Sequence, residues 1–305
     1  MEYILTTKDL TKKYKKFKAV SKVNMHVEKG AIYGFIGRNG AGKTTFLKII
    51  SGLSSQTKGE LTIMGKTGAE LSSVRDKIGC LIEAPGIIPK MNAYDNIKMK
   101  CIAKGIHDKK YIEDLLTLVG LADTGKKPAK KFSLGMRQRL GIALALVGNP
   151  EMLVLDEPIN GLDPQGIVEV RDLILKLNQE RNITIIISSH ILGELSKLCT
   201  HYGIINQGKL MIELSNEELI DKCSSKLDIE VSDTDKAIGV INELGIAKYK
   251  VTSTNHIELF ENIEDSALIN ERLVKSGVAV SELSKNNEDL ENYFIRLTGG
   301  EEEDD

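Results

Sequence analysis

A glycine-rich stretch early in the chain constrains the fold more than any other feature of the sequence. It reads Gly37-Arg38-Asn39-Gly40-Ala41-Gly42-Lys43-Thr44 and fits the pattern G-x-x-x-x-G-K-[ST]. The run Ala31–Gly37 predicts a strand before the pattern, and Lys43–Ile50 predicts a helix after it. Glycines let the backbone curl so that its N–H groups point at phosphate oxygens, and the helix N-terminus adds positive potential. The sequence therefore predicts a nucleotide phosphate loop over Gly37–Thr45, in which Lys43 contacts the β- and γ-phosphates and the Thr44 hydroxyl binds Mg²⁺.

The composition excludes some classes of protein. The 305-residue chain has a formal net charge of −2, which argues against a general nucleic-acid binder because phosphate contacts need a basic surplus. Its four cysteines have no paired spacing, which indicates reduced thiols rather than a disulfide framework or a zinc site. No apolar run approaches the roughly 18 residues that span a membrane, and Met1–Lys18 lacks the apolar core of a signal peptide. We therefore expect a cytosolic protein that serves any membrane process through a partner.

From Tyr3 to about Gly208 the chain alternates β-branched runs with helical stretches, which predicts α/β architecture with right-handed crossovers. Met152–Leu155 and Thr184–Ser188 are continuous apolar runs, as expected for buried strands of a parallel sheet. The amphipathic stretch Gly166–Arg181 between them predicts a helix. Lys90–Gly125 has helical periodicity and almost no β-branched runs. We predict a helical insertion there, with helices over Tyr94–Lys104 and Lys109–Leu118 and a further helix over Gly135–Gly148.

The composition changes at residues 216–225, which we interpret as a linker to a second domain. Residues 226–298 predict elements in the order βαββαβ, typical of a small ferredoxin-like α+β domain. The strands are predicted at Leu227–Val231, Lys248–Thr252, His256–Phe260 and Val278–Leu283, and the helices at Thr234–Leu244 and Ser266–Ser276. A last helix, Glu288–Leu297, precedes an acidic tail at residues 299–305 that we expect to be disordered. The periodicity alone also allows a less regular α+β module.

Polar side chains follow two of the predicted buried strands. Asp156 and Glu157 end the first, at the sheet edge where ligands bind in such folds. Asp156 there suits a Mg²⁺ held through water, and Glu157 suits activation of an attacking water, although solvated acids also commonly end a strand. His190 follows the second strand and suits a hydrogen bond to the γ-phosphate, whereas a histidine alone there is more often an ordinary surface residue.

With these residues in order, the first two-thirds of the chain resembles the nucleotide-binding subunits of ABC transporters. Phe132-Ser133-Leu134-Gly135-Met136-Arg137-Gln138 looks like the signature motif of that family. Asn160-Gly161-Leu162-Asp163 looks like the loop whose aspartate communicates between subunits, and Tyr14 lies where the family has an aromatic ring that stacks on adenine. The resemblance implies a cassette over residues 1–215, with a RecA-like parallel sheet core and a helical subdomain at about 88–150. For Tyr14, an ordinary surface position is the alternative.

The resemblance also implies a mechanism of ATP hydrolysis that requires two copies of the chain. Two cassettes are expected to dimerise head to tail, so that each ATP lies between one phosphate loop and the signature of the other copy. The Ser133 hydroxyl and the Gly135 N–H then contact the γ-phosphate, aided by the positive end of the following helix. Asp163 belongs to the same nucleotide-binding interface. Hydrolysis separates the subunits and drives a transmembrane permease partner at the cytoplasmic face of the membrane.

The sequence departs from the common family pattern at two places, and these departures indicate which group within the family it resembles. The signature has Leu134 and Met136 where glycine and glutamine are commonest, but it retains Ser133 and Gly135. Glu83 stands where most members have a glutamine that contacts Mg²⁺ and the attacking water. A carboxylate there is similar to the lantibiotic-immunity and bacitracin-resistance subunits, as are the chain length and the segments Tyr33–Gly40 and Leu290–Phe294.

The resemblance thus implies export of an antimicrobial peptide for immunity or resistance. A drug, lipid or ion remains open as the exported substrate, and the glutamate is neutral to substrate in the alternative interpretation. A soluble ABC ATPase acting on ribosomes or DNA fits less well, because the chain has one cassette, no heptad run and a slightly acidic balance. An unrelated phosphate-loop kinase or NTPase is disfavoured by the signature and by His190.

Overall fold

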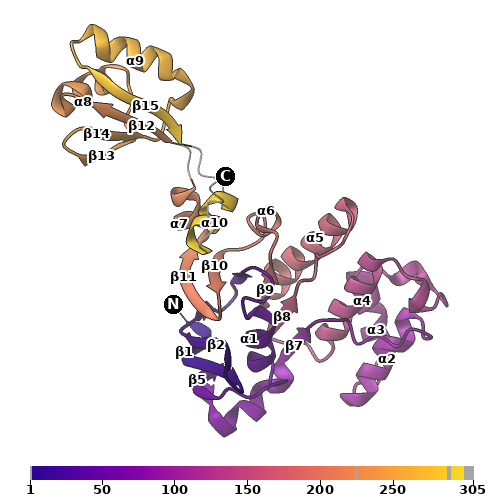
Figure 1. The fold of residues 1–305 in the computed structure, drawn as a ribbon. Coiled ribbons are helices and arrows are strands. Elements are labelled where there is room, and N and C mark those ends of the chain that lie inside the picture. The colour runs from indigo at the N-terminus through magenta and orange to yellow at the C-terminus, as the bar shows by residue number, and fades with distance from the viewer. Residues whose placement is uncertain (1, 224–225, 287–289, 299–305) are drawn as a thin grey trace. The chain divides into compact units, whose positions relative to one another are not determined.

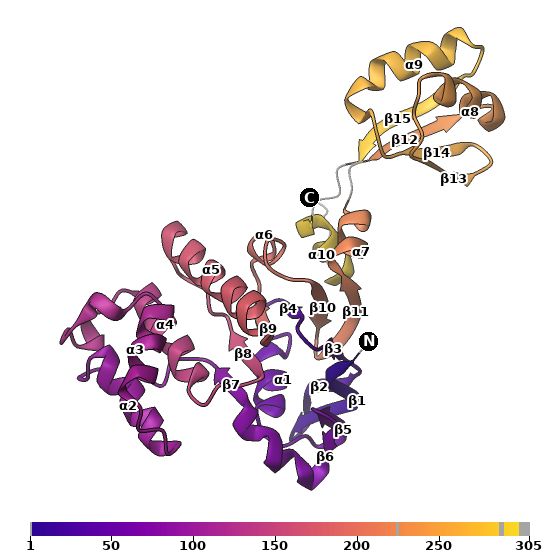
Figure 2. The same cartoon turned by 180° about the vertical axis from the view of Figure 1, so that it is seen from behind.

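The computed structural model describes residues 2–223, 226–286 and 290–298. The chain divides into two compact units, Met1–Asn216 and Glu217–Asp305. Figures 1 and 2 draw the elements of both units from opposite sides. Among the described residues, no helix combines the length and the apolar composition needed to cross a bilayer.

A mostly parallel sheet forms the centre of the first unit, with the strand order β11-β10-β4-β9-β8-β7. Its strands are β4 (Ile32–Ile36), β7 (Ile78–Leu81), β8 (Met152–Asp156), β9 (Thr184–Ser189), β10 (His201–Asn206) and β11 (Lys209–Ser215). Neighbours pair in parallel except β10 and β11, which are antiparallel. Every residue of β4, β8 and β9 is buried, which explains their continuous apolar sequences and confirms the strands predicted there.

A second, antiparallel sheet packs beside the first and was not predicted from the sequence. Its strands are β1 (Tyr3–Tyr14), β2 (Phe17–Val23), β3 (His26–Glu28), β5 (Lys58–Ile63) and β6 (Lys66–Thr67). The order is β2-β1-β5-β6, with β3 also paired to β1. The two residues of β6 are exposed, the other strands are buried only in part, and register shifts interrupt the pairing of β1 with its neighbours. The apolar alternation that marks a strand is therefore weak here.

Helix α1 (Lys43–Ile50) joins the two sheets into one core. Its Phe46 packs against Phe35 of β4, with the ring centroids 5.0 Å apart, and its other apolar side chains meet residues of both sheets. A 3-10 segment, Gly68–Lys77, leads from the antiparallel sheet into β7. Burying one apolar helix face between two sheets fixes the start of α1, and with it the loop that precedes the helix.

A helical region follows β7 and lies away from the antiparallel sheet in both views of the unit (Figures 1 and 2). It contains α2 (Ala93–Ala103), α3 (Lys109–Leu118), α4 (Leu134–Leu146) and the 3-10 turns Ala122–Thr124 and Ala129–Lys131. Each α-helix begins at a residue whose side chain accepts a backbone N–H bond, namely Asn92, Asp108 and Ser133. The helices predicted in this region are confirmed. Two further helices, α5 (Pro164–Arg181) and α6 (Leu192–Leu195), complete the unit.

The second unit contains an antiparallel sheet with the strand order β13-β14-β12-β15. Its elements run β12 (Lys226–Val231), α8 (Thr234–Glu243), β13 (Tyr249–Ser253), β14 (His256–Leu259), a 3-10 turn (Ile263–Asp265), α9 (Ser266–Lys275) and β15 (Val280–Asn286). Apolar side chains of α8 and α9 form a core with alternate residues of the strands. Both helices thus cover the same face of this sheet (Figure 1). The predicted βαββαβ order is present in the structure.

Two further features concern the ends of this unit. Residues predicted as a linker include helix α7 (Asn216–Lys222), in which Leu219 is buried. Its first turn carries Glu217 and Glu218 and its last turn carries Lys222, which complement the helix dipole and explain why this short polar segment is helical. The predicted last helix is α10 (Leu290–Thr298). The predicted acidic tail, residues 299–305, lies outside the described residues.

Candidate nucleotide-binding site

The phosphate loop connects β4 to α1 and packs closely against neighbouring backbone. Gly42 has φ +109°, and a Cβ atom there would lie 2.3 Å from the Ala19 carbonyl oxygen in β2. Gly208 after β10 donates its N–H to the Ala41 carbonyl at 2.8 Å. Gly40 also has a positive φ, +82°, but the space beside it is open. Close packing from two sides therefore requires glycine at position 42, whereas conformation alone favours it at position 40.

Lys43 is buried inside this loop, with 5% of the residue exposed. Its ammonium donates to the Gly37 carbonyl at 2.6 Å and lies 3.2 Å from Glu157 Oε1. A buried ammonium needs such oxygen partners, and phosphate oxygens are partners of the same kind. The sequence placed Lys43 at the phosphates, and the structure brings it to the carboxylate predicted to activate water.

Asp156 lies at the end of β8 and accepts hydrogen bonds on both carboxylate oxygens. The Thr44 hydroxyl donates to Oδ2 at 2.8 Å, and the Ser188 hydroxyl of β9 donates to Oδ1 at 2.6 Å. Asp156 is 6% exposed, so these bonds replace the water that a buried carboxylate loses. The structure therefore brings together Thr44 and Asp156, which were predicted separately as Mg²⁺ ligands.

Glu157 follows Asp156 in a left-handed backbone conformation with φ +49°. Its N–H donates to Ser188 Oγ at 3.0 Å, which fixes the turn. Its carboxylate lies between Lys43 and His190, whose Nδ1 is 2.9 Å from Glu157 Oε2. Positive φ is uncommon for a residue with a side chain and is concentrated at functional sites. The predicted base and the predicted γ-phosphate sensor are thus in direct contact.

These groups fit a magnesium nucleotide. The first turn of α1 leaves N–H groups without partners inside the helix, and such groups favour an anion, as does the buried Lys43 ammonium. Thr44 and Asp156 supply oxygen atoms alone, which is the ligand type that Mg²⁺ prefers. Arg38, Asn39 and Gly40 are exposed at the mouth of the loop, and Thr45 is half-buried in α1.

The predicted signature residues lie at the start of α4. Ser133 is the N-cap of this helix, and its hydroxyl accepts the Met136 N–H at 3.2 Å. A Cβ atom on Gly135 would lie 3.7 Å from the Gly166 Cα, at the start of α5. Asp163 caps α5 by accepting the Gly166 N–H at 3.0 Å. The structure therefore brings the signature next to the loop of Asp163.

The signature does not meet the phosphate loop of the same chain. Among the described residues, no hydrogen bond or ion pair joins Ser133 or Gly135 to residues 37–45. Tyr14 ends β1 in the hairpin with β2, the strand whose Ala19 touches Gly42. Its ring is 48% exposed and lies under the Lys12 ammonium, 5.0 Å from the centroid. Tyr14 is thus a surface residue on a hairpin whose other strand packs against the phosphate loop.

Glu83 follows β7 and forms an ion pair with Lys48 of α1 at 2.5 Å. Its side chain is 63% exposed, and its φ is +62°. In the part of the chain that the structure describes, no hydrogen bond or ion pair joins Glu83 to Thr44 or Asp156. The carboxylate therefore reaches the helix that the phosphate loop begins, rather than the predicted Mg²⁺ ligands.

Two residues of this site were missed by sequence reasoning. Ser188 positions Asp156 and Glu157, and Lys48 positions Glu83. The sequence did contain a sign of Ser188, because a hydroxyl at the end of a buried apolar strand needs a hydrogen-bond partner. The sequence contained no sign of the role of Lys48, since a lysine in a helix is ordinarily exposed to solvent.

Comparison with known proteins identifies the family. The family model for ABC transporters matches residues 20–160. The bacitracin transport ATP-binding protein BcrA of Bacillus licheniformis is 42% identical over 302 residues, covering 98% of this chain and 99% of the relative. The chain belongs to the ABC transporter ATP-binding proteins.

Other matches agree with this family. The lantibiotic transport ATP-binding protein SrtF of Streptococcus pyogenes is 44% identical over 69% of this chain and 90% of its own length. A dimeric ATP-binding cassette in a post-hydrolysis state, bound to ADP and Pi, superposes with a TM-score of 0.64 at 27% identity. That match covers 70% of this chain and 98% of the solved cassette. The first unit of this ABC protein is therefore an ATP-hydrolysing cassette, as the resemblance implied.

Proposed function

We propose that this ABC protein energises the export of an antimicrobial peptide of the lantibiotic or bacitracin type, giving immunity or resistance. The full-length similarity to a bacitracin transport ATP-binding protein carries the proposal, because it includes the second unit as well as the cassette. The similarity to a lantibiotic transport protein, and Glu83 in place of the common glutamine, support the same branch.

The contacts of the nucleotide site support a division of labour in hydrolysis. Thr44 and Asp156 would hold Mg²⁺, and Glu83 would join them after leaving its ion pair with Lys48. The bound ion would neutralise charge on the phosphates. Lys43 exchanges the Gly37 carbonyl and Glu157 for the β- and γ-phosphate oxygens. Glu157, released from the ammonium, then accepts a proton from the attacking water.

The contact between His190 and Glu157 gives the histidine a part in the same step. Its Nδ1 orients the carboxylate, while the other ring nitrogen would be available to the γ-phosphate. The phosphate loop from Gly37 to Thr45 binds the phosphates through its N–H groups, and the Tyr14 ring stacks on the adenine.

A second copy of the chain completes each site. Ser133 and Gly135 of that copy contact the γ-phosphate, and Asp163 transmits the state of one site to the other. This arrangement is supported by the separation of the signature from the phosphate loop within one chain. It is also supported by the dimeric state of the ADP-bound cassette to which this protein is similar.

The conformational change that ATP hydrolysis drives acts on a transmembrane permease at the cytoplasmic face of the cell membrane. The peptide passes through this permease. The second unit is a ferredoxin-like domain, since its βαββαβ elements form a sheet with the order β13-β14-β12-β15. We assign residues 1–215 to the cassette and residues 226–298 to this accessory domain. Nucleic acid is not among the expected partners.

Two measurements test the proposal together. A strain that lacks the protein should become more sensitive to bacitracin or to one of a panel of lantibiotics, and the wild-type chain should restore tolerance. The Glu157→Gln chain should not. Affinity purification should recover a polytopic membrane protein. Recovery of ribosomes instead, or unchanged tolerance across the panel, contradicts the peptide-export proposal.

A further inference from the structure

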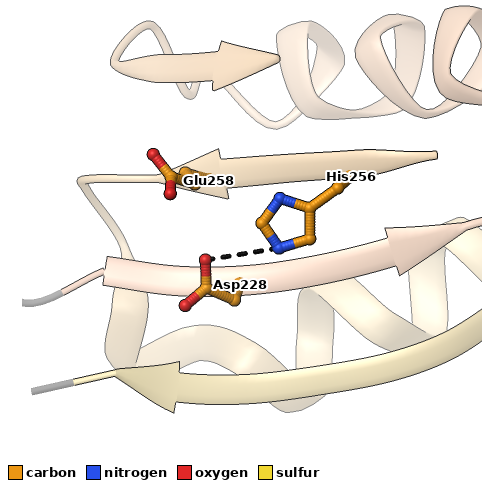
Figure 3. Close-up of side chains that lie close together, drawn as sticks. All are labelled: Asp228, His256 and Glu258. Atoms are coloured by element: carbon orange, nitrogen blue, oxygen red, sulfur yellow. Dashed lines mark ion pairs between the residues drawn. The ribbon is translucent and has the colours of Figure 1, made fainter. Parts of the chain in front are cut away.

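Three side chains with atoms that can ligate a metal lie close together on the face of the second unit's sheet that α8 and α9 leave uncovered. Asp228 of β12 pairs across the strands with Glu258 of β14, and His256 is two residues before Glu258. The residues between them, Ile229 and Ile257, point into the core. Because side chains alternate along a strand, all three polar groups share the opposite face. Figure 3 shows the imidazole directed at the Asp228 carboxylate on the neighbouring strand.

The distances between their donor atoms suit a common ion. His256 Nε2 and Asp228 Oδ1 are 3.4 Å apart, which is longer than a hydrogen bond. Two ligands bound at 2.0–2.1 Å to a tetrahedral ion lie about 3.4 Å apart. One donor atom from each of the three residues fits within a mutual distance of 4.8 Å. We infer that Asp228, His256 and Glu258 form a binding site for a divalent transition-metal ion, with Zn²⁺ the best match.

The orientation of the imidazole supports this assignment. The other ring nitrogen, Nδ1, lies 2.5 Å from the hydroxyl oxygen of Thr252 on β13. A bond from Nδ1–H to that hydroxyl leaves Nε2 as the unprotonated nitrogen, directed at Asp228. Metal-binding histidines ordinarily make such a second bond, which fixes both the tautomer and the ring. The mixed set of one imidazole and two carboxylates favours zinc over Mg²⁺ or Ca²⁺, which prefer oxygen ligands alone.

The surroundings are acidic and open enough to admit an ion. The three residues line a cavity of about 320 Å³ together with Lys226, Glu230, Glu282 and Ser284. The side chains of Asp228 and Glu258 are 15% and 16% exposed, and that of His256 is 32% exposed. An ion therefore meets ligands that are partly removed from water and are surrounded by further negative charge.

The Lys226 ammonium contacts two of the three proposed ligands. It lies 2.5 Å from Glu258 Oε1 and 3.4 Å from Asp228 Oδ1. The lysine thus holds two carboxylates together, as a cation would. Zinc and the ammonium compete for the same oxygens.

Because of this competition, loss of a ligand or its partner should weaken zinc binding, whereas loss of the Lys226 ammonium should strengthen it. Equilibrium dialysis of the full, nucleotide-free chain against Zn²⁺ alone should show one more bound ion for the wild type than for His256→Gln. Thr252→Val should weaken binding of that ion about 10-fold or more, since loss of a ligand's outer partner typically has such an effect. Lys226→Met should tighten it about 10-fold, because a competing positive charge is gone.

His107→Gln is the matched control, because His107 is an exposed histidine in the first unit. Its zinc stoichiometry and affinity should equal those of the wild type. Circular dichroism spectra that superpose will show that each variant is folded, and Glu258→Gln provides a second ligand variant of the same shape. Equal zinc binding by the wild type, His256→Gln and Glu258→Gln overturns the inference, as does weaker binding by Lys226→Met.

Discussion

The Thr44 hydroxyl donates a 2.8 Å hydrogen bond to Asp156 Oδ2 and so ties the first turn of α1 to the end of β8. These residues are 112 positions apart in the chain. Ser188 completes the connection from β9, the strand between β4 and β8. A displacement of the phosphate loop would therefore also displace the carboxylates at the end of β8.

Glu157→Gln should bind ATP yet hydrolyse it at least about 100-fold more slowly than the wild type, because the amide does not accept the proton of the attacking water. Bound ATP should then hold two copies together, which size-exclusion chromatography with ATP detects alongside a phosphate-release assay.

Glu151→Gln provides the control for this change. Glu151 is also a glutamate at one end of β8, but its side chain is 45% exposed and pairs with Lys77 at the other end of the sheet. Its turnover should match the wild type. Near-normal hydrolysis by Glu157→Gln contradicts the role of Glu157.

Ser188→Ala should lower ATP turnover about 10-fold to 100-fold, the usual range for loss of a hydrogen bond that orients a metal ligand. It should also lower the free energy of unfolding by about 1–3 kcal/mol, because the buried Asp156 loses a donor. Steady-state kinetics over a Mg²⁺ series and urea unfolding measure the two effects. Ser196→Ala changes an exposed serine that directly follows α6, and it should affect neither measurement. A wild-type Mg²⁺ dependence for Ser188→Ala would show that Ser188 does not position the carboxylate.

Gly42→Ala should abolish nucleotide binding, because the added methyl group would approach the Ala19 carbonyl oxygen to 2.3 Å and the loop must move. Gly40→Ala is the matched comparison. It meets open space and carries only the cost of a left-handed backbone, roughly 1–2 kcal/mol. Binding of a fluorescent ATP analogue should therefore be lost in the first variant and retained, although weaker, in the second. Equal binding by both variants would mean that the Ala19 contact is unimportant.

Glu83→Ala should reduce resistance to the exported peptide more than it reduces ATP binding, if this carboxylate couples the site to the permease. Its stability cost should stay below about 1 kcal/mol, because the ion pair with Lys48 is exposed. Glu70→Ala removes another exposed carboxylate and should leave both measurements unchanged. Full resistance in Glu83→Ala would make the residue a bystander.

Stability should decline as the pH rises above about 9. Burial raises the pKa of Cys199 and of Tyr202, and burial together with the Glu213 carboxylate raises the pKa of Tyr33. The folded chain then holds protons that the unfolded chain loses above the ordinary values of 9.0 and 10.0, so unfolding becomes more favourable. Urea unfolding between pH 8 and pH 11 measures the slope. Tyr33→Phe should reduce it, whereas Tyr3→Phe, at an exposed ring, should not.

The strands of the parallel sheet were predictable because their sequences are typical of buried strands. Strands β8 and β9 are buried on both faces, so their sequences are uninterrupted apolar runs with polar residues at the end. The antiparallel sheet gave no such signal, since buried and exposed residues do not alternate regularly along β1 and its register shifts repeatedly. Helix α7 was missed because a short polar helix has the composition of a linker.

The site was predictable only in part, for a similar reason. Lys43, Thr44 and Asp156 belong to local patterns whose chemistry depends on neighbours in sequence. The partners of these residues come from distant parts of the chain. Neither the Ser188 bond to Asp156 nor the Lys48 pair with Glu83 follows from local spacing, because each depends on the order of strands in the sheet.

The lack of a hydrogen bond between Ser133 and the phosphate loop of the same chain has a genetic consequence for the proposed dimer. In the proposed dimer every ATP is held by two gene products, so a cell with intact and defective alleles assembles mixed pairs. A chain disabled at Ser133 spoils the site built on its partner's phosphate loop and leaves its own loop to be completed by the intact copy. In that arrangement such an allele should be partly dominant. Two alleles that are defective in different halves of the site should restore one working site when they are expressed together.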